Sequence, residues 1–170
     1  IGYMIQQSLQ NKLRDMQIDR EVVTIITQVI VDKNDPSIKS PTKYIGARYD
    51  KTEAQSFSKS FGWTIKEQES DRWRRVVASP MPKYIMHGKS IKALVNRGTI
   101  VIASGGGGIP VFNNVSGHLE GLDGVIDKDY TAAKLGRIIR ATELWIITDV
   151  DYIYQDFGKP SQKPIKNISI

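Results

Sequence analysis

The chain has 170 residues, of which 40% are hydrophobic and 25% charged, and its mean hydropathy is −0.31. These values are typical of a globular domain and exclude a disordered or fibrous chain. No apolar run approaches the roughly 20 residues of a membrane helix, and the lack of cysteine excludes disulfides, thiolate metal sites and a cysteine nucleophile.

The formal net charge of +6 favours an anionic partner, such as a nucleotide, a phosphorylated metabolite or a nucleic acid. The basic residues are spread along the chain, and the densest cluster is Arg72-Trp73-Arg74-Arg75. A solvated surface accounts for that cluster, so nucleic-acid binding ranks last among the partners. The chain begins at Ile1 without an initiator Met or a signal segment. We therefore expect a fragment of a longer, cytoplasmic protein with no membrane partner.

In the first part of the chain, a helix is predicted before a buried strand. Apolar residues recur every three or four positions from Ile5 to Met16, as on one face of an amphipathic helix. Residues 21–31 are almost all β-branched and apolar on both alternations, which is typical of a strand buried on both faces.

Residues 32–71 break this pattern with several prolines and glycines and are too long for a simple loop. We expect a small protruding subdomain or lid, with a helix over 52–61 and a hairpin formed by 63–66 and 73–77. An irregular surface insertion is an equally good interpretation.

The remaining chain alternates strands and helices. A short strand is predicted at Ile85, a helix over 91–96 capped by Ser90, and a second buried strand over 99–103. After a loop-like stretch at 113–123, a helix starting at Asp129 or Thr131 is predicted to end near Arg140, before a third buried strand at 143–148. The fold class is therefore α/β, a sandwich with a largely parallel sheet, and ligands of such sheets bind at the carboxyl ends of the strands.

The first candidate site is a run of four glycines, Gly105, Gly106, Gly107 and Gly108, directly after a buried strand. Glycine allows close approach of the backbone to a ligand, and free N–H groups bind anions. The run lacks the features of a nucleotide P-loop and of a dinucleotide-binding fingerprint. An oxyanion or phosphate site is favoured over a flexible turn.

The second candidate is Asp127-Lys128-Asp129, which precedes a predicted helix. Acidic residues at this position are common helix caps. A lysine held between two carboxylates also has the charge needed to offset a transferring phosphoryl group.

The turn Thr148-Asp149-Val150-Asp151 closes the third predicted strand and offers hydroxyl, backbone and carboxylate groups to a nucleotide, or is an ordinary capped turn. Tyr154 follows it and could stack on a base or simply pack. The two histidines lie in no metal-ligand spacing, so no protein metal site is predicted.

Several long motifs in order resemble the carbamate kinases of the amino acid kinase family. They include Val31-Asp-Lys-Asn-Asp-Pro36, Pro41-Thr-Lys43, Trp73-Arg-Arg-Val-Val77, Ile102-Ala-Ser-Gly-Gly-Gly-Gly-Ile-Pro-Val111, Val125-Ile-Asp-Lys-Asp129 and Phe157-Gly-Lys-Pro160. The resemblance spans residues 1–170 and implies a three-layer α/β/α sandwich with a mostly parallel central sheet. It also implies a homodimer that converts carbamoyl phosphate and ADP to carbamate and ATP, with Mg²⁺, in arginine catabolism.

By matching position, the resemblance implies a role for each candidate residue. Lys128 would stabilise the transferring phosphoryl group, Asp129 would orient catalytic lysines, and Lys43 would reach the substrate from the protruding subdomain. Gly105 to Gly108 would cradle the substrate, and Thr148, Asp149, Val150 and Tyr154 would bind the nucleotide.

Two segments of the family are absent from the sequence, an N-terminal Gly-Gly-Asn-Ala loop and a C-terminal Gly-Ser-Met-Gly-Pro-Lys segment. We expect both to lie outside this chain, which would then be the central part of the family domain. Two alternative functions stay open: a non-catalytic nucleotide or anion sensor, and a sister amino acid kinase that acts on a carboxylate.

Overall fold

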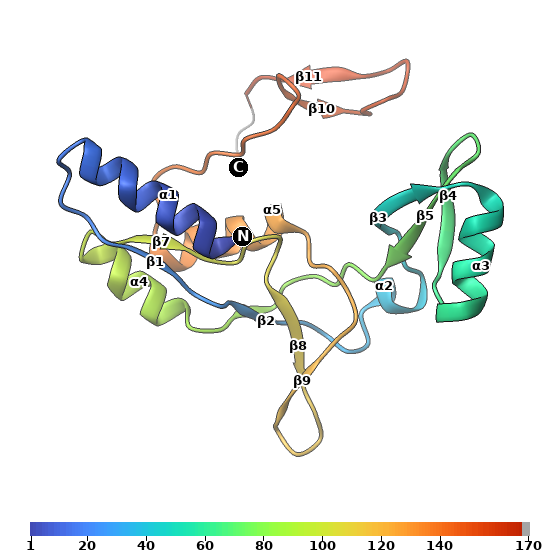
Figure 1. Cartoon of the computed structure of the whole chain (residues 1–170), viewed down its shortest axis with the longest axis horizontal. Helices are drawn as coiled ribbons and strands as arrows, with labels where there is room; N and C mark the ends of the chain where they lie inside the picture. The colour runs from blue at the N-terminus through green and yellow to red at the C-terminus, as the bar shows by residue number, and fades with distance from the viewer. Residues whose placement is uncertain (168–170) are drawn as a thin grey trace.

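The computed structural model describes residues 1–167 and has an α/β fold, as the sequence predicts (Figure 1). Its main body contains α1 (Gly2–Asp15), β1 (Val22–Thr24), α4 (Gly88–Asn96), β7 (Ile100–Ile102) and α5 (Lys128–Ile139). Strands β1 and β7 pair in parallel. Helix α1 packs on β1, α4 packs on β7, and α5 packs on α4. Helices α1 and α4 lie on opposite sides of this strand pair, which gives a layered arrangement.

A second sheet of the main body has the order β6-β2-β8-β9. It is formed by β2 (Gln28–Ile30), β6 (Tyr84–Ile85), β8 (Ile109–Asn113) and β9 (Leu119–Gly121). Strands β2 and β8 are parallel, whereas β6 and β9 are antiparallel edge strands. The parallel pairing predicted for the sheet is therefore confined to β1–β7 and β2–β8 among the named strands of the main body.

The single strand predicted over 21–31 is instead two strands, β1 and β2, separated by residues 25–27. Ile26 in this break has 77% of its surface exposed. The Thr27 hydroxyl donates to the Ile25 carbonyl oxygen at 3.0 Å, a local bond that competes with the strand ladder. Because of the break, β1 pairs with β7 and β2 pairs with β8, so one apolar run supplies a strand to each of two sheets.

The hydrophobic core lies between the second sheet and α5. Its buried members are Val29, Val31, Ile85 and Ile126. Leu122, Leu135 and Ile138 pack against them. Because Ile126 immediately precedes the α5 cap, this core fixes the position of the first turn of α5.

Residues 43–77 form a separate unit that protrudes from the main body, which we call the 43–77 unit (Figure 1). Its sheet has the order β3-β5-β4 and is antiparallel throughout. The strands are β3 (Lys43–Tyr49), β4 (Ile65–Glu69) and β5 (Arg72–Val77), and α3 (Lys51–Phe61) covers them after the short helix α2 (Pro36–Lys39). The predicted helix and hairpin are confirmed. The sheet unit runs from Lys43 to Val77, however, and not over the predicted range of 32–71.

Helix α3 forms where the sequence predicts it because both of its ends carry local signals. The Asp50 carboxylate accepts from the Glu53 backbone N–H while the Glu53 side chain accepts from the Asp50 N–H, which makes a capping box. Gly62 ends the helix with φ +67°. On the inner face of α3, the Phe57 ring packs 4.9 Å from that of Tyr49 and 5.5 Å from that of Trp63, centroid to centroid.

The third buried strand predicted over 143–148 is wrong. The segment has no strand pairing, and Trp145 and Ile147 are 78% and 87% exposed. An apolar β-branched run becomes a buried strand only when a neighbouring strand satisfies its backbone, and no such neighbour lies beside it among residues 1–167. It leads instead to a hairpin of β10 (Ile153–Gln155) and β11 (Lys163–Ile165).

Smaller differences concern element bounds. Helix α4 begins at Gly88 with His87 as its cap residue, ahead of the predicted cap Ser90. The predicted loop over 113–123 contains β9, which pairs with β8 as a hairpin. Helix α5 and strand β6 lie where the sequence predicts them. Across residues 1–167, helices are too short or too polar to cross a bilayer.

Candidate active site

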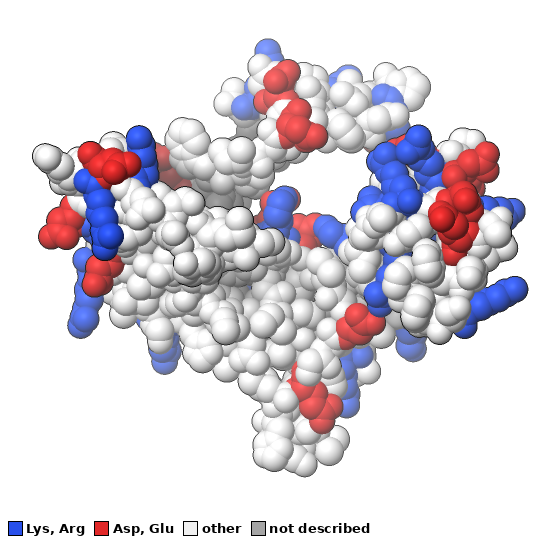
Figure 2. Space-filling view, viewed as in Figure 1, with Lys and Arg blue, Asp and Glu red and all other residues white. Residues whose placement is uncertain are grey.

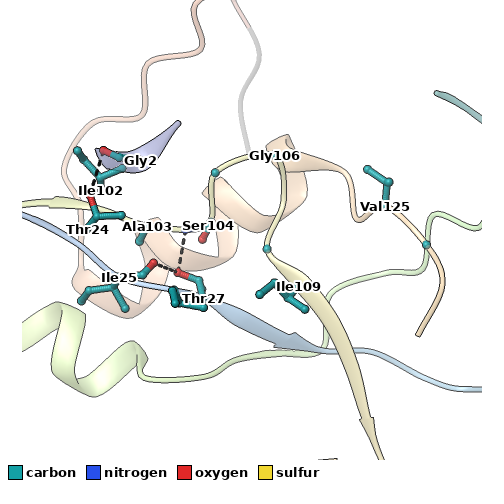
Figure 3. A pocket seen from close by; sticks show the side chains of 14 residues that line it. Gly2, Thr24, Ile25, Thr27, Ile102, Ala103, Ser104, Gly106, Ile109 and Val125 are labelled. Carbon is teal, nitrogen blue, oxygen red and sulfur yellow. Dashed lines mark hydrogen bonds between the residues drawn. The ribbon is translucent and has the colours of Figure 1, made fainter. Parts of the chain in front are cut away.

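A cavity of about 460 Å³ lies where β1 and β7 end. Residues that follow the two strands line it, including Ile25, Thr27, Ala103 and Ser104, together with Gly2 at the start of α1 (Figure 3). Gly124 and Val125, which precede α5, complete the wall. The cavity therefore occupies the carboxyl edge of the parallel strand pair, where ligands of α/β sheets bind.

The four predicted cradle glycines divide into two pairs. A Cβ atom added to Gly105 or Gly106 would meet no heavy atom within 4 Å, so this pair faces open space beside the cavity. A Cβ atom on Gly107 would overlap the Ile126 carbonyl oxygen, and one on Gly108 would overlap the Val29 side chain. The first pair thus leaves room for a ligand, whereas the second pair allows the loop to pack against the core.

Thr131 connects this glycine loop to α5 through a hydrogen bond. Its buried hydroxyl donates to the Gly107 carbonyl oxygen at 2.9 Å. The same hydroxyl lies 3.3 Å from the Asp127 carbonyl oxygen, one turn earlier in the helix. The loop and the first turn of α5 therefore hold a fixed relative position.

The first turn of α5 carries the predicted Asp127-Lys128-Asp129 motif. The Asp127 carboxylate caps the helix by accepting from the Asp129 backbone N–H at 2.9 Å. The Lys128 ammonium donates to the Asp129 carboxylate at 3.1 Å, and both side chains are at least half exposed. The sequence predicts Lys128 between two carboxylates, but among residues 1–167 its ammonium pairs with Asp129, and it remains accessible from solvent.

Lys43, the first residue of β3, reaches this helix terminus from the 43–77 unit. Its Nζ donates to Asp127 Oδ2 at 2.8 Å, and the two side chains are 37% and 31% exposed. The Lys43 hydrogen bond holds the pKa of the Asp127 carboxyl below its usual value; partial burial opposes this shift, and the Asp129 N–H and the Lys128 charge reinforce it. Asp127 therefore stays ionised and keeps Lys43 at the main body.

The structure thus brings three predicted catalytic residues, Lys43, Lys128 and Asp129, to one helix terminus. They do not line the cavity themselves but lie beside it, since Val125 in its wall is two residues from the α5 cap. Positive and negative side chains gather at the floor of the opening between the main body, the 43–77 unit and the β10–β11 hairpin (Figure 2).

The predicted nucleotide residues lie elsewhere. Thr148, Asp149 and Val150 belong to the exposed segment that follows α5, and Tyr154 is in β10. None of the four lines the cavity at β1 and β7. The ring of Tyr154 packs instead against Phe157, with centroids 5.7 Å apart. Their role in nucleotide binding stays a prediction.

The sequence reasoning missed three residues that hold the site together. The sequence predicts Asp127 only as a cap or as a partner of Lys128, whereas its close partner is Lys43. It predicts Thr131 only as a possible helix start and Thr27 only as part of a strand, whereas both hydroxyls bind distant backbone groups. The position of Asp127 in the acidic motif is a sequence signal for its role in the site. The roles of Thr131 and Thr27 have no such signal, because their hydroxyls bind backbone groups far away in the sequence.

Comparison of this chain with known proteins identifies its family. The model of the amino acid kinase family matches residues 42–170, which is most of the chain. The chain belongs to the amino acid kinase family. The family assignment agrees with the glycine loop at the strand ends and with the α/β fold.

Curated relatives of this amino acid kinase chain are carbamate kinases. The carbamate kinase of Clostridium perfringens is 49% identical, and that of Pyrococcus horikoshii 46%, over all 170 residues. The chain spans 54% of the length of each, about half. A carbamate kinase from Giardia lamblia bound to AMP-PNP superposes with a TM-score of 0.78 at 32% identity, covering 96% of this chain and 52% of that one.

Proposed function

We propose that this chain carries the central part of a carbamate kinase, which transfers a phosphoryl group between carbamoyl phosphate and ADP to give carbamate and ATP. The observation that carries the proposal is the Lys43–Asp127 pair at the start of α5. It gathers two lysines and two carboxylates beside a glycine loop and a cavity at the strand ends. The 45–49% identity to carbamate kinases supports this choice within the family.

Phosphoryl transfer needs positioning and positive charge more than covalent chemistry from the protein. In the proposed reaction Lys128 offsets the charge of the transferring group, and Asp129, 3.1 Å from its ammonium, orients it. Lys43 contacts the substrate from the 43–77 unit, which acts as the substrate-facing subdomain or lid. The open pair Gly105 and Gly106 borders the space for the substrate. The Gly106 N–H is the donor of this pair that can bind the substrate, because the Gly105 N–H donates to the Ala103 carbonyl oxygen at 2.8 Å.

The nucleotide is proposed to bind through Thr148, Asp149, Val150 and Tyr154, with Mg²⁺ as its counterion. Residues 1–167 contain no group of three or more histidine, cysteine, aspartate or glutamate side chains placed to hold a metal. Mg²⁺ bound mainly through nucleotide phosphates needs only one or two protein carboxylates, which this donor set offers. We also propose a cytoplasmic homodimer that works in arginine catabolism, as the resemblance implies.

The proposal is tested by measuring ATP formation from ADP and carbamoyl phosphate with the complete protein, with and without Mg²⁺. We expect turnover that requires Mg²⁺ and falls at least 100-fold in kcat for Lys128→Ala, since one transition-state contact is worth about 3 kcal/mol. Lys89→Ala, an exposed lysine on α4, is the matched control and should keep the wild-type rate.

Other results of the same assay favour the alternatives. Nucleotide binding without turnover would favour a sensor on the same fold. Turnover with a small carboxylate in preference to carbamoyl phosphate would favour a sister kinase. An unchanged rate in Lys128→Ala would remove the role assigned to this lysine.

A further inference from the structure

Ser104, which follows β7 directly, has a side-chain hydroxyl that the fold leaves unused. Its Oγ is buried and has no hydrogen-bond partner among residues 1–167. The other unpartnered buried side-chain atoms in this part of the chain belong to α2 and β5, and none of them lines the cavity. A buried hydroxyl without a partner costs about 1–3 kcal/mol, so a ligand that supplies a partner would recover this cost.

The backbone at Ser104 is also strained. Its φ is +65°, a conformation that non-glycine residues adopt at a cost. Two hydrogen bonds hold this conformation. The Gly105 N–H donates to the Ala103 carbonyl oxygen at 2.8 Å across Ser104, and the buried Thr27 hydroxyl accepts from the Ser104 N–H at 2.9 Å while donating to the Ile25 carbonyl. Glycine at this position would remove the strain. Among residues 1–167, the serine side chain makes no polar contact that would offset this cost.

Ser104 lines the cavity in which a small ligand would sit, and its buried Oγ would reach that space by rotation about the Cα–Cβ bond. The residue immediately precedes Gly105 and Gly106, the two glycines beside open space (Figure 3). The Gly105 and Gly107 N–H groups donate to the Ala103 and Ser104 carbonyl oxygens. A ligand anion would therefore rest on the Gly106 N–H, near Ser104. The residues predicted to bind the nucleotide, at 148–154, do not line this cavity, which favours the small substrate as the neighbouring ligand.

We propose that the Ser104 hydroxyl donates a hydrogen bond to an oxyanion oxygen of carbamoyl phosphate or carbamate, and that Thr27 holds Ser104 in the strained conformation that aims it there. This inference rests on the proposed function for the identity of the substrate. It assigns Ser104 to substrate binding and Thr27 to positioning.

The test is steady-state kinetics of the complete protein in the direction of ATP formation, for wild type, Ser104→Ala and Ser104→Gly. Both variants should raise KM for carbamoyl phosphate about tenfold or more, as expected for loss of a hydrogen bond to a charged group. KM for MgADP should stay within about twofold. Ser104→Gly should also raise Tm above that of Ser104→Ala, because it removes the backbone strain. Ser116→Ala, in the exposed β8–β9 turn, is the control and should behave as wild type.

Binding of carbamoyl phosphate is measured separately by the increase in Tm that it causes. An active wild type whose KM for carbamoyl phosphate is unchanged in Ser104→Ala overturns the role of Ser104 and leaves the proposed reaction standing. If Ser104→Ala raises both KM values equally and also lowers Tm, the residue has a structural role, and its role in substrate binding is overturned. An inactive wild type that carbamoyl phosphate stabilises, but not after Ser104→Ala, overturns the reaction and supports Ser104. Absence of both turnover and stabilisation overturns both proposals.

Discussion

At the scale of single residues, the site combines side chains that face a ligand with side chains that hold the loop. Gly106 and Gly107 are neighbours with opposite surroundings. The space next to Gly106 is open, whereas Gly107 has φ +130° and its missing Cβ leaves room for the Ile126 carbonyl. Alanine should therefore have different effects at the two positions.

We expect Gly106→Ala to leave Tm within about 2 °C of wild type and to raise KM for carbamoyl phosphate, because the added methyl group enters the space of the ligand. Gly107→Ala should lower the free energy of unfolding by more than about 2 kcal/mol, from left-handed strain and steric overlap. Thermal unfolding and steady-state kinetics of both variants check this. Similar losses of stability in the two variants would contradict the division of the loop into an open and a packed pair.

The Lys43–Asp127 pair predicts a specific dependence of stability on pH. Because the folded-state pKa of Asp127 is depressed, its contribution is present above the unfolded value of about 3.9 and is lost as pH falls through the folded value. Lys43→Met should lower the free energy of unfolding by about 0.5 kcal/mol at pH 7, a small effect because both groups are partly exposed. Urea unfolding between pH 3 and 7 should show this difference shrinking below about pH 4. A difference that persists undiminished in acid, or that Lys89→Met reproduces, would rule out Asp127 as its source.

At the scale of elements, the first turn of α5 connects the glycine loop, the acidic motif and the 43–77 unit. Three contacts converge on it: Thr131 with Gly107, Asp127 with the Asp129 N–H, and Asp127 with Lys43. Each comes from a different part of the chain. The helix terminus therefore sets the geometry of the site.

Thr131→Val should separate the loop from the helix without changing the volume of the side chain. We expect a loss of about 1–2 kcal/mol, since the Gly107 carbonyl would lose its buried donor. KM for carbamoyl phosphate should rise as the loop loosens. Chemical denaturation and kinetics measure the two effects, and Thr131→Ser, which keeps the hydroxyl, should recover most of the KM effect. If Thr131→Ser and Thr131→Val raise KM for carbamoyl phosphate equally, the hydrogen bond to Gly107 does not order the loop.

At the scale of the whole molecule, side-chain pairs join the 43–77 unit to the main body in two places. Lys43 binds Asp127, and Arg75, whose guanidinium lies 5.0 Å from the Trp63 ring centroid, binds the exposed Asp123 at 3.4 Å. A partly exposed pair of this kind is weak. Weak links of this kind would let the 43–77 unit open and close over a substrate, as the prediction of a lid requires.

We therefore expect ligand binding to slow amide hydrogen exchange in β4, β5 and α3. Exchange of the complete protein should be compared with and without ADP and carbamoyl phosphate, with α4 as an internal reference that should change little. Equal exchange of the 43–77 unit in both conditions would count against a lid.

Most local elements, and the family, can be predicted from the sequence alone. Amphipathic periodicity predicts α1, the Asp50–Glu53 capping box and Gly62 delimit α3, and the acidic cap starts α5, because these signals act between residues a few positions apart. The ordered motifs indicated the amino acid kinase family, which the family match confirms. The glycine loop and the acidic motif predict where the candidate site lies.

The pairing of the strands and the contacts between distant residues depend on the tertiary structure. The run over 21–31 became two strands in two sheets, and the run over 143–148, with the same β-branched character, remained exposed, because a strand is buried only where another strand pairs with it. Lys43 and Asp127 are 84 residues apart in sequence, and the division of the glycine loop depends on Val29 and Ile126. Contacts of this kind depend on the path of the whole chain, so patterns among residues a few positions apart do not predict them.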